Sequence, residues 1–308
     1  MRISLTARDK YLQCPRSYKL HYRDNLRPVK ESSALKFGSA LDNGLNHLLL
    51  TRNVQEAQSI FWMDWAEWEN KPVIDYFKSD LDINLLTESD CNELDSISDP
   101  VLKEHKANWK SLYYKGLKLI QLYNDKILPS IEEVIAVQKE INITNEDGDN
   151  ITGIIDLIAK IKLDTGEVVV AVLDNKSTSS PYPKNSYATK HQTALYTFVE
   201  GIEYAGFLTV NKKEFKHQII VGKVPEEFQE KVLQEFVDVI DQIKAEQFPK
   251  IEKKNCFAFG QRCSFYNYCW NNEDMRGLYV KEFAQEVSVD SHTTNNTSVN
   301  SISTEAGD

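Results

Sequence analysis

Gly153-Ile-Ile-Asp-Leu-Ile158 and Val168-Val-Val-Ala-Val-Leu-Asp-Asn-Lys176 are the two stretches that decide the fold of this 308-residue chain. Both are rich in β-branched residues, and a turn sequence, Asp164-Thr-Gly166, separates them. They therefore predict neighbouring antiparallel strands over 151–161 and 168–174. A third such run, 134–143, is followed by a polar turn and completes a predicted antiparallel meander of three strands.

Three charged side chains lie in this predicted meander. Asp156 interrupts a strand otherwise suited to burial, while Asp174 and Lys176 lie at the end of the next strand. Side chains alternate along a strand, so Asp174 and Lys176 face the same side, and the short turn places Asp156 on the neighbouring strand. Because buried charges are costly unless they are paired or bind a metal, the pattern indicates either a metal site or an ion pair that only orders the sheet.

The flanking sequence favours an α/β protein. Apolar residues at helical spacing predict helices over 34–50, 54–68, 107–127, 187–204 and 225–247, a strand over 217–221, and two short helical pieces within 3–23 hinged at Cys14-Pro15. We expect one domain over 1–284, made of a helical region (34–130), a core (131–250) and a cysteine-rich closing segment (251–284). Residues 285–308 are Ser/Thr/Asn-rich and lack Lys, Arg, Phe, Trp and Tyr, which predicts a disordered tail.

The net charge of −10 is unevenly distributed along the chain. Residues 1–36 hold nine Lys/Arg against three Asp/Glu, whereas residues 64–99 hold two against eleven. A nucleic acid would be attracted to the first segment, and a basic protein partner to the second. Ordinary solvated helix faces are the alternative explanation of both.

The basic segment interleaves cations with tyrosines, a mixture that suits single-stranded nucleic acid because it offers both phosphate contacts and stacking faces. The alternative is a helix with buried tyrosines and solvated cations. The candidate nucleic-acid contacts are Arg8, Lys10, Arg16, Lys19 and Tyr22.

No window reaches the roughly 18–20 consecutive apolar residues of a membrane span, and residues 1–10 lack the pattern of a signal peptide. We therefore expect a cytoplasmic protein with no membrane partner. A reducing compartment keeps thiols available for metals or clusters.

Three of the five cysteines lie close together, as Cys256-x6-Cys263-x5-Cys269. Three thiolates do not complete a tetrahedral site, and Cys14 would be the fourth ligand. Structural zinc is one possible occupant, although its common signatures pair cysteines two to four residues apart, which this chain lacks. Unligated packing cysteines are a further alternative, and Cys91 has no obvious role.

The order of these motifs resembles the RecB-like branch of the PD-(D/E)XK nucleases over residues 6–270. The matching elements are the Thr6-x4-Tyr11-x2-Cys14-Pro15 opening, Gly38-x3-Asp42, Asp156, Asp174-x-Lys176, Gln192-x3-Tyr196 and the closing cysteines. The resemblance implies a restriction-endonuclease-like core, a central mixed sheet flanked by helices. It also implies a helical N-terminal insertion and an iron-sulfur-stapled subdomain that joins the two ends of the chain.

The resemblance also assigns roles to residues. It implies that Asp156 and Asp174 hold Mg²⁺ or Mn²⁺, that Lys176 positions the attacking water, and that Gln192 and Tyr196 flank the site. Hard oxygen ligands suit these cations independently of the resemblance. It further implies a [4Fe-4S] cluster on four cysteines, which are the usual ligands of such a cluster: Cys14, Cys256, Cys263 and Cys269.

One position departs from the family pattern. Many members carry a histidine where this chain has Asp42, which either provides a third metal-binding carboxylate or marks a weakened site. His47 and Glu140 are further candidate ligands, although a packed histidine and an exposed strand glutamate explain them as well.

The leading hypothesis is a metal-dependent DNA exonuclease that acts on single-stranded ends in recombination, repair or phage DNA metabolism. The alternative is a degenerate nuclease fold that binds DNA or protein within a recombination complex.

Overall fold

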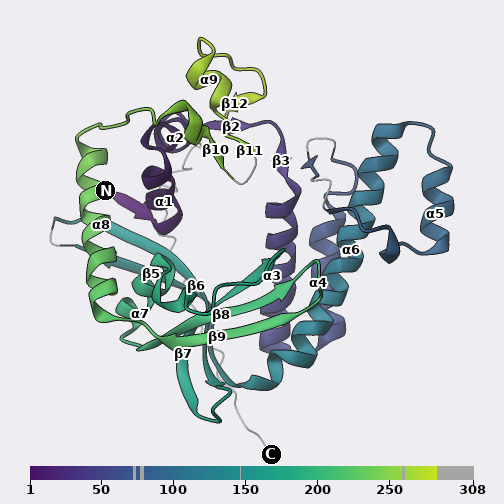
Figure 1. Ribbon diagram of the computed structural model, residues 1–308, viewed down its shortest axis with the longest axis horizontal. Coiled ribbons are helices and arrows are strands. Elements are labelled where there is room, and N and C mark those ends of the chain that lie inside the picture. Colours follow the sequence, from purple (N-terminus) through teal and green to yellow (C-terminus); the bar gives the residue numbers. More distant parts are fainter. Residues whose placement is uncertain (72–73, 77–79, 146, 259–260, 283–308) are drawn as a thin grey trace, which may run out of the picture.

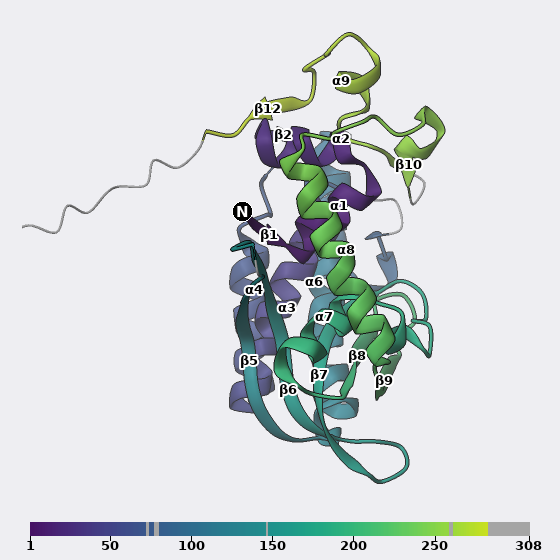
Figure 2. The same ribbon diagram turned by 90° about the vertical axis from the view of Figure 1, so that its left-hand side faces the viewer.

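The computed structural model describes residues 1–71, 74–76, 80–145, 147–258 and 261–282. Its centre is a mixed β-sheet with helices packed on both faces (Figures 1 and 2). The strands run in the order β1-β6-β7-β8-β9, and β5 pairs with β6 along its other edge. The strands of this sheet are β1 (Arg2–Ser4), β5 (Ile131–Thr144), β6 (Asn150–Lys162), β7 (Val168–Thr178), β8 (Tyr204–Asn211) and β9 (His217–Lys223). The predicted α/β class, with a central mixed sheet flanked by helices, is confirmed.

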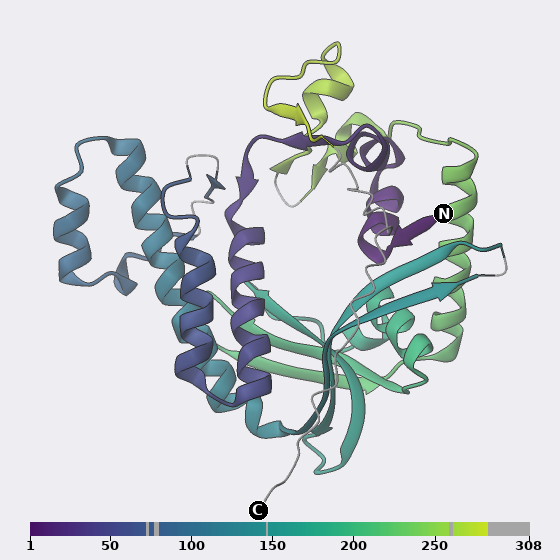
Figure 3. The ribbon, with the colours of Figure 1, turned by 180° about the vertical axis from the view of Figure 1, so that it is seen from behind.

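Each face of the sheet has its own apolar core. One core joins Leu157 and Leu173 to α3 (Ser33–Thr51), α4 (Val54–Ala66) and α6 (Pro100–Lys126). The other joins Ile158 and Val172 to α1 (Leu5–Gln13), α7 (His191–Glu200) and α8 (Glu226–Lys244). Figure 3 shows α3 and α4 side by side. The alternation of residues along β6 and β7 therefore directs successive side chains into two different cores.

Shorter elements complete the described chain. They are α2 (Pro15–Tyr18), a π-helical turn (Lys19–Arg23), β2 (Leu26–Pro28), β3 (Glu31–Ser32), β4 (Ile74–Asp75), a 3₁₀ turn (Ile83–Leu85), α5 (Glu88–Asp95), three further 3₁₀ turns (Leu128–Ser130, Ser186–Ala188 and Lys253–Cys256), β10 (Phe257–Ala258), β11 (Gln261–Arg262), α9 (Tyr266–Trp270) and β12 (Leu278–Val280). None of the helices over the described residues combines the length and apolar character that a bilayer crossing requires.

The predicted meander is confirmed, since β5, β6 and β7 pair antiparallel in succession. The predicted hinge at Cys14-Pro15 is also confirmed, because α1 ends at Gln13 and α2 starts at Pro15. The helix predicted over 107–127 begins earlier, at Pro100, because the Asp99 side chain accepts hydrogen bonds from the first turn. The tail predicted from residue 285 lies outside the described residues.

The sequence analysis missed β8, which pairs in parallel with β7. The helix predicted over 187–204 ends at Glu200, where Gly201 adopts the left-handed conformation with φ 64°. Seven of the eight residues of β8 are buried, so it shows no alternation of apolar and polar residues. A strand covered on both faces lacks the period on which the prediction relied.

Two strands share one edge of β6. β7 pairs with β6 from Leu157 to Lys162, and β1 pairs with it from Asn150 to Thr152. The stretch 153–156 lies between these two ladders, at a fork in the sheet. β1, which continues directly into α1, thus occupies this edge of β6 ahead of the part that pairs with β7. Asp156 lies at the point where β6 and β7 separate.

The two ends of the described chain lie together. β2 and β12 pair antiparallel, matching Leu26 with Val280. Leu20, Leu26, Phe265 and Leu278 form a small core there. Figures 1 and 3 show α9 and β12 beside the segment that holds α2 and β2. The cysteine-rich segment is thus packed against the N-terminal helices.

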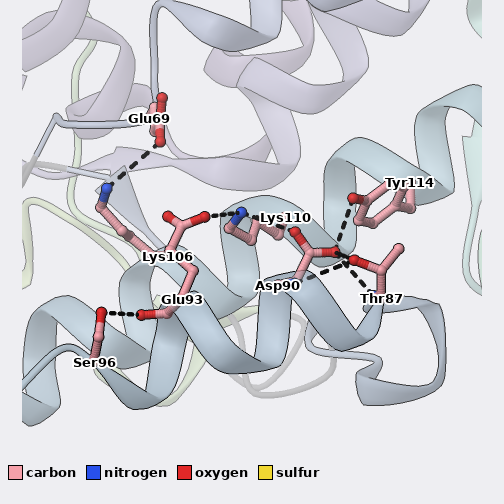
Figure 4. Close-up of polar contacts among 8 residues, drawn as sticks. All are labelled: Glu69, Thr87, Asp90, Glu93, Ser96, Lys106, Lys110 and Tyr114. Atoms are coloured by element: carbon pink, nitrogen blue, oxygen red, sulfur yellow. Dashed lines mark hydrogen bonds and ion pairs between the residues drawn. The ribbon is translucent and has the colours of Figure 1, made fainter.

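A buried carboxylate attaches α5 to α6 (Figure 4). Asp90 accepts hydrogen bonds from the Thr87 backbone and hydroxyl, from Lys110 at 2.9 Å and from Tyr114 at 2.8 Å. Burial opposes ionisation, but these donors together hold the pKa of Asp90 well below its ordinary value. Glu93 also pairs with Lys110 at 2.9 Å, yet its side chain is 50% exposed.

Replacement of Asp90 by Asn should therefore lower the free energy of unfolding by about 1–3 kcal/mol, because it leaves charged and hydroxyl donors poorly satisfied. The matched variant Glu93→Gln removes an exposed partner of the same lysine and should cost less than about 1 kcal/mol. Urea unfolding at neutral pH measures both values. Equal losses in the two variants would contradict this account of the α5 attachment.

Candidate active site

Asp174 organises the polar residues at the end of β7. Its side chain is 6% exposed, and its Oδ2 lies 2.6 Å from the Lys176 ammonium. From α7, Gln192 donates a hydrogen bond to Oδ1 at 2.5 Å. Gln192 thus meets the predicted strand pair Asp174 and Lys176. It does so because α7 packs on the face of the sheet to which Asp174 points.

Asp156 faces this group from the fork in β6. Its Oδ2 accepts a hydrogen bond of 3.2 Å from the backbone N–H of Asn175, so the carboxylate bridges the separating strands. Burial, followed by repulsion from Asp174 and Asp42, raises the pKa of Asp156 to about 8. Burial lowers the pKa of Lys176, but Asp174 and Asp156 outweigh it and raise that pKa above its ordinary value. Lys176 is therefore a cation near neutral pH.

Asp42 approaches from α3 on the other side. It accepts hydrogen bonds from Asn46 at 3.2 Å and Gln138 at 3.3 Å. Burial raises its pKa, and the charge of Asp174 adds to the shift. A cavity of about 440 Å³ lies between α3 and the fork; its lining includes Asp42, Asp156, Asn175, Lys176 and Ser177.

Tyr196 lies on the α7 side of the fork, against β6. A Cβ on Gly153 would lie 2.9 Å from the Tyr196 ring, so the close approach of ring and strand requires glycine at this position. Burial and the charges of Asp156 and Asp174 raise the pKa of Tyr196 to about 12. Its hydroxyl thus remains a neutral donor beside the carboxylates.

The donor chemistry of the site fits a divalent cation. Three carboxyl groups interact there with one ammonium, and hard oxygen donors of this kind are the ligands that Mg²⁺ and Mn²⁺ prefer. Across the described part of the chain, however, no three His, Cys, Asp or Glu side chains are already arranged as a metal site. The carboxylates would have to shift when they bind a cation.

Two weaker candidates lie apart from these contacts. His47 pairs with Glu56 of α4 at 2.9 Å. Glu140 is exposed on β5. Glu140 thus matches its alternative, an exposed strand glutamate, whereas His47 is hydrogen-bonded but half-exposed and is not packed in the core.

The four predicted cluster cysteines come from two distant segments. Cys14, Cys256 and Cys263 line a cavity of about 250 Å³ between the end of α1 and the closing segment. Burial raises the pKa of Cys269, and the nearby Cys263 and Cys14 raise it further, which places Cys269 beside the same group. Cys91 is exposed on α5. Over the described residues these thiols are also not arranged as a metal site.

The structure revises one predicted nucleic-acid contact. Arg8 is fully buried: it pairs with Asp9 at 2.8 Å and with Glu235 of α8, and its guanidinium lies 4.9 Å from the centre of the Phe236 ring. Its cation therefore anchors α1 to α8 and does not face solvent. The sequence pattern misled because a basic residue next to tyrosines looks the same whether its partner is a phosphate or a carboxylate.

The other predicted contacts are partly exposed. Arg16 and Lys19 line a surface hollow with Phe248, and Lys19 pairs with Asp24 at 2.7 Å. Lys10 lines the cavity of the cysteines. The Tyr22 ring lies tilted beside the Tyr18 ring, with ring centres 5.1 Å apart. These residues remain available as candidate contacts for a nucleic acid.

The chain belongs to the PD-(D/E)XK nuclease superfamily, whose family model matches residues 2–270. Members of this superfamily are typically metal-dependent nucleases, and DNA is the expected substrate. Among curated proteins, no relative matches the chain. A solved structure titled "Crystal structure of SSO0001" is similar at 16% identity, covering 59% of this chain and 78% of that one, with a TM-score of 0.33. That likeness is too low to support an argument.

The raised pKa of Asp156 predicts a stability effect in the metal-free protein. The folded state holds the Asp156 proton more tightly than the unfolded state does. The stability that this protonated carboxyl contributes is therefore lost as pH rises from about 4 through about 8. Asp156→Asn should therefore increase the free energy of unfolding by about 1–3 kcal/mol at pH 9, with a gain that shrinks toward pH 4.

Urea unfolding in the presence of a chelator measures this difference across the pH range. Asp164→Asn, in the exposed turn between β6 and β7, is the control and should show no such trend. A pH-independent difference between Asp156→Asn and the wild type would contradict the assignment.

Proposed function

We propose that this protein is a metal-dependent DNA exonuclease that acts on single-stranded ends in recombination, repair or phage DNA metabolism. The observation that carries the proposal is the meeting of Asp42, Asp156 and Asp174 with Lys176 at the fork between β6 and β7. The basic segment that precedes α3 supports a polyanionic substrate.

In this proposal Asp42, Asp156 and Asp174 hold Mg²⁺ or Mn²⁺. A bound cation of this kind activates water and neutralises charge on the phosphate. Lys176 contributes a fixed positive charge that orients the attacking water and stabilises the developing negative charge. Gln192 holds the Asp174 carboxylate in place through Oδ1. Tyr196 contributes a neutral hydroxyl donor beside the two strand carboxylates.

We further propose that the four cysteines hold a [4Fe-4S] cluster, with structural Zn²⁺ as the alternative. The gathering of thiols from α1 and from the closing segment around one cavity supports this proposal. Such a cluster would fix the basic N-terminal segment relative to the sheet. The acidic region 64–99 is proposed as a docking surface for a basic protein partner.

The second candidate function is a degenerate nuclease fold that binds DNA or protein without cleavage. Asp42 in place of the usual histidine favours it, and so does the Lys176–Asp174 ion pair, which occupies a carboxylate that a cation would need. Calorimetric titration with Mn²⁺ separates the two, because a degenerate site need not bind the cation.

Asp174→Asn and Lys176→Met should each reduce Mn²⁺-dependent cleavage of a single-stranded oligonucleotide at least about 100-fold, because the first removes a proposed ligand of the cation and the second removes the proposed positive charge beside the attacking water. Gel analysis of an end-labelled oligonucleotide measures the rate. Lys160→Met is the matched control, since Lys160 is a strand lysine of β6 paired with Glu133 on the sheet surface. Cleavage that persists unchanged in both site variants would refute the proposed function.

Protein purified without oxygen should absorb broadly near 400 nm, as cysteine-bound iron-sulfur clusters do. Cys263→Ser should remove most of this absorption, whereas Cys91→Ser should retain it, because Cys91 lies exposed on α5. A colourless protein with one equivalent of zinc would favour the alternative metal, and a metal-free protein would exclude both.

A further inference from the structure

Asn175 lies between Asp174 and Lys176 in β7, and its side chain points to the opposite face of the sheet. It is 9% exposed and lines the cavity that also contains Asp42 and Asp156. Its backbone N–H donates to Asp156. Asn175 therefore contacts the candidate site through its backbone and its side chain.

The side-chain amide of Asn175 is only half satisfied. Its Oδ1 accepts a hydrogen bond of 2.9 Å from the hydroxyl of Tyr123. Its Nδ2 finds no acceptor among the residues that the structure describes. A buried donor without an acceptor is costly in a folded protein and calls for an explanation, such as a bound water, ion or ligand. One donor of a residue that lines the cavity is thus without a partner among the described residues, and because this atom is covered, a ligand reaches it only when the cavity lining shifts.

Tyr123 fixes the direction of this amide. It lies in α6, is fully buried, and belongs to the apolar core beneath the sheet. Because its hydroxyl donates to Oδ1, the amide cannot rotate by half a turn without losing that bond. Tyr123 therefore holds the Nδ2 group in the orientation in which it lacks a protein acceptor.

We propose that Nδ2 of Asn175 donates a hydrogen bond to a phosphate oxygen of the bound nucleic acid, and that Tyr123 positions it. This inference rests on the proposed nuclease function. It adds a neutral substrate contact on the α3 side of the fork, opposite Lys176. Asn175 and Lys176 line one cavity although their side chains leave opposite faces of β7, because the pairing of β7 with β6 ends at Leu173.

The test compares Asn175→Leu, Tyr123→Phe and the double variant. Loss of a hydrogen bond to a charged group predicts that Asn175→Leu lowers kcat/KM for single-stranded DNA cleavage by about 10- to 100-fold. Tyr123→Phe should lower it by about 3- to 10-fold, because the amide remains but loses its orientation. The double variant should be no worse than Asn175→Leu, since Tyr123 acts through Asn175.

Asn108→Leu is the matched control, because Asn108 is another buried asparagine, placed in α6 away from the cavity. It should lower the melting temperature, as Asn175→Leu should, while leaving kcat/KM of the folded protein unchanged. Asn175→Leu activity within about twofold of the wild type, or additive losses in the double variant, would overturn the inference.

A binding measurement separates this inference from the proposed function. Fluorescence anisotropy with a labelled single-stranded oligonucleotide in Ca²⁺ reports phosphate contacts without cleavage. Weaker binding by Asn175→Leu, but not by Asn108→Leu, would support the contact even if the wild type does not cleave. A wild type that neither cleaves nor binds would overturn both proposals, whereas a cleaving wild type with unaffected Asn175→Leu binding and activity would overturn this inference alone.

Discussion

The structure depends on one electrostatic constraint: three carboxylates and a single ammonium share a partly buried fork in a β-sheet. Asp156 and Asp174 are next to Leu157 and Leu173, the last pair of the β6–β7 ladder, so both lie where the two strands separate. Burial, followed by repulsion from Asp174 and Asp42, raises the pKa of Asp156, so this carboxyl holds its proton more tightly than a solvated one.

Elements from distant parts of the chain surround this fork. β1 pairs with the far end of β6 and leads directly into α1, which the buried Arg8 fastens to α8 through Glu235. α7 contributes Gln192 and Tyr196 from one face, and α3 contributes Asp42 from the other. The buried contact between Tyr123 and Asn175 extends this support into the core under α6. Positions far apart in the chain thus set the direction of each side chain at the site.

Local patterns predicted those parts that depend on neighbouring residues. The meander of β5, β6 and β7 followed from β-branched runs and polar turns, and the Cys14-Pro15 hinge followed from the chemistry of proline. β8 was missed because burial on both faces removes the strand period. The prediction for Arg8 was wrong because its carboxylate partner on α8 lies 227 residues away, where no local pattern can indicate it.

The sequence by itself determined the α/β class, the adjacent strands and the presence of Asp156, Asp174 and Lys176 on them, because alternation and turn chemistry act over a few residues. Only the tertiary structure decided that Gln192 reaches Asp174, that Asp42 shares the cavity, and that the cysteines of the two ends gather. These contacts depend on how helices pack across the sheet. Packing is set by the shapes of two complete cores, which no short stretch of sequence contains.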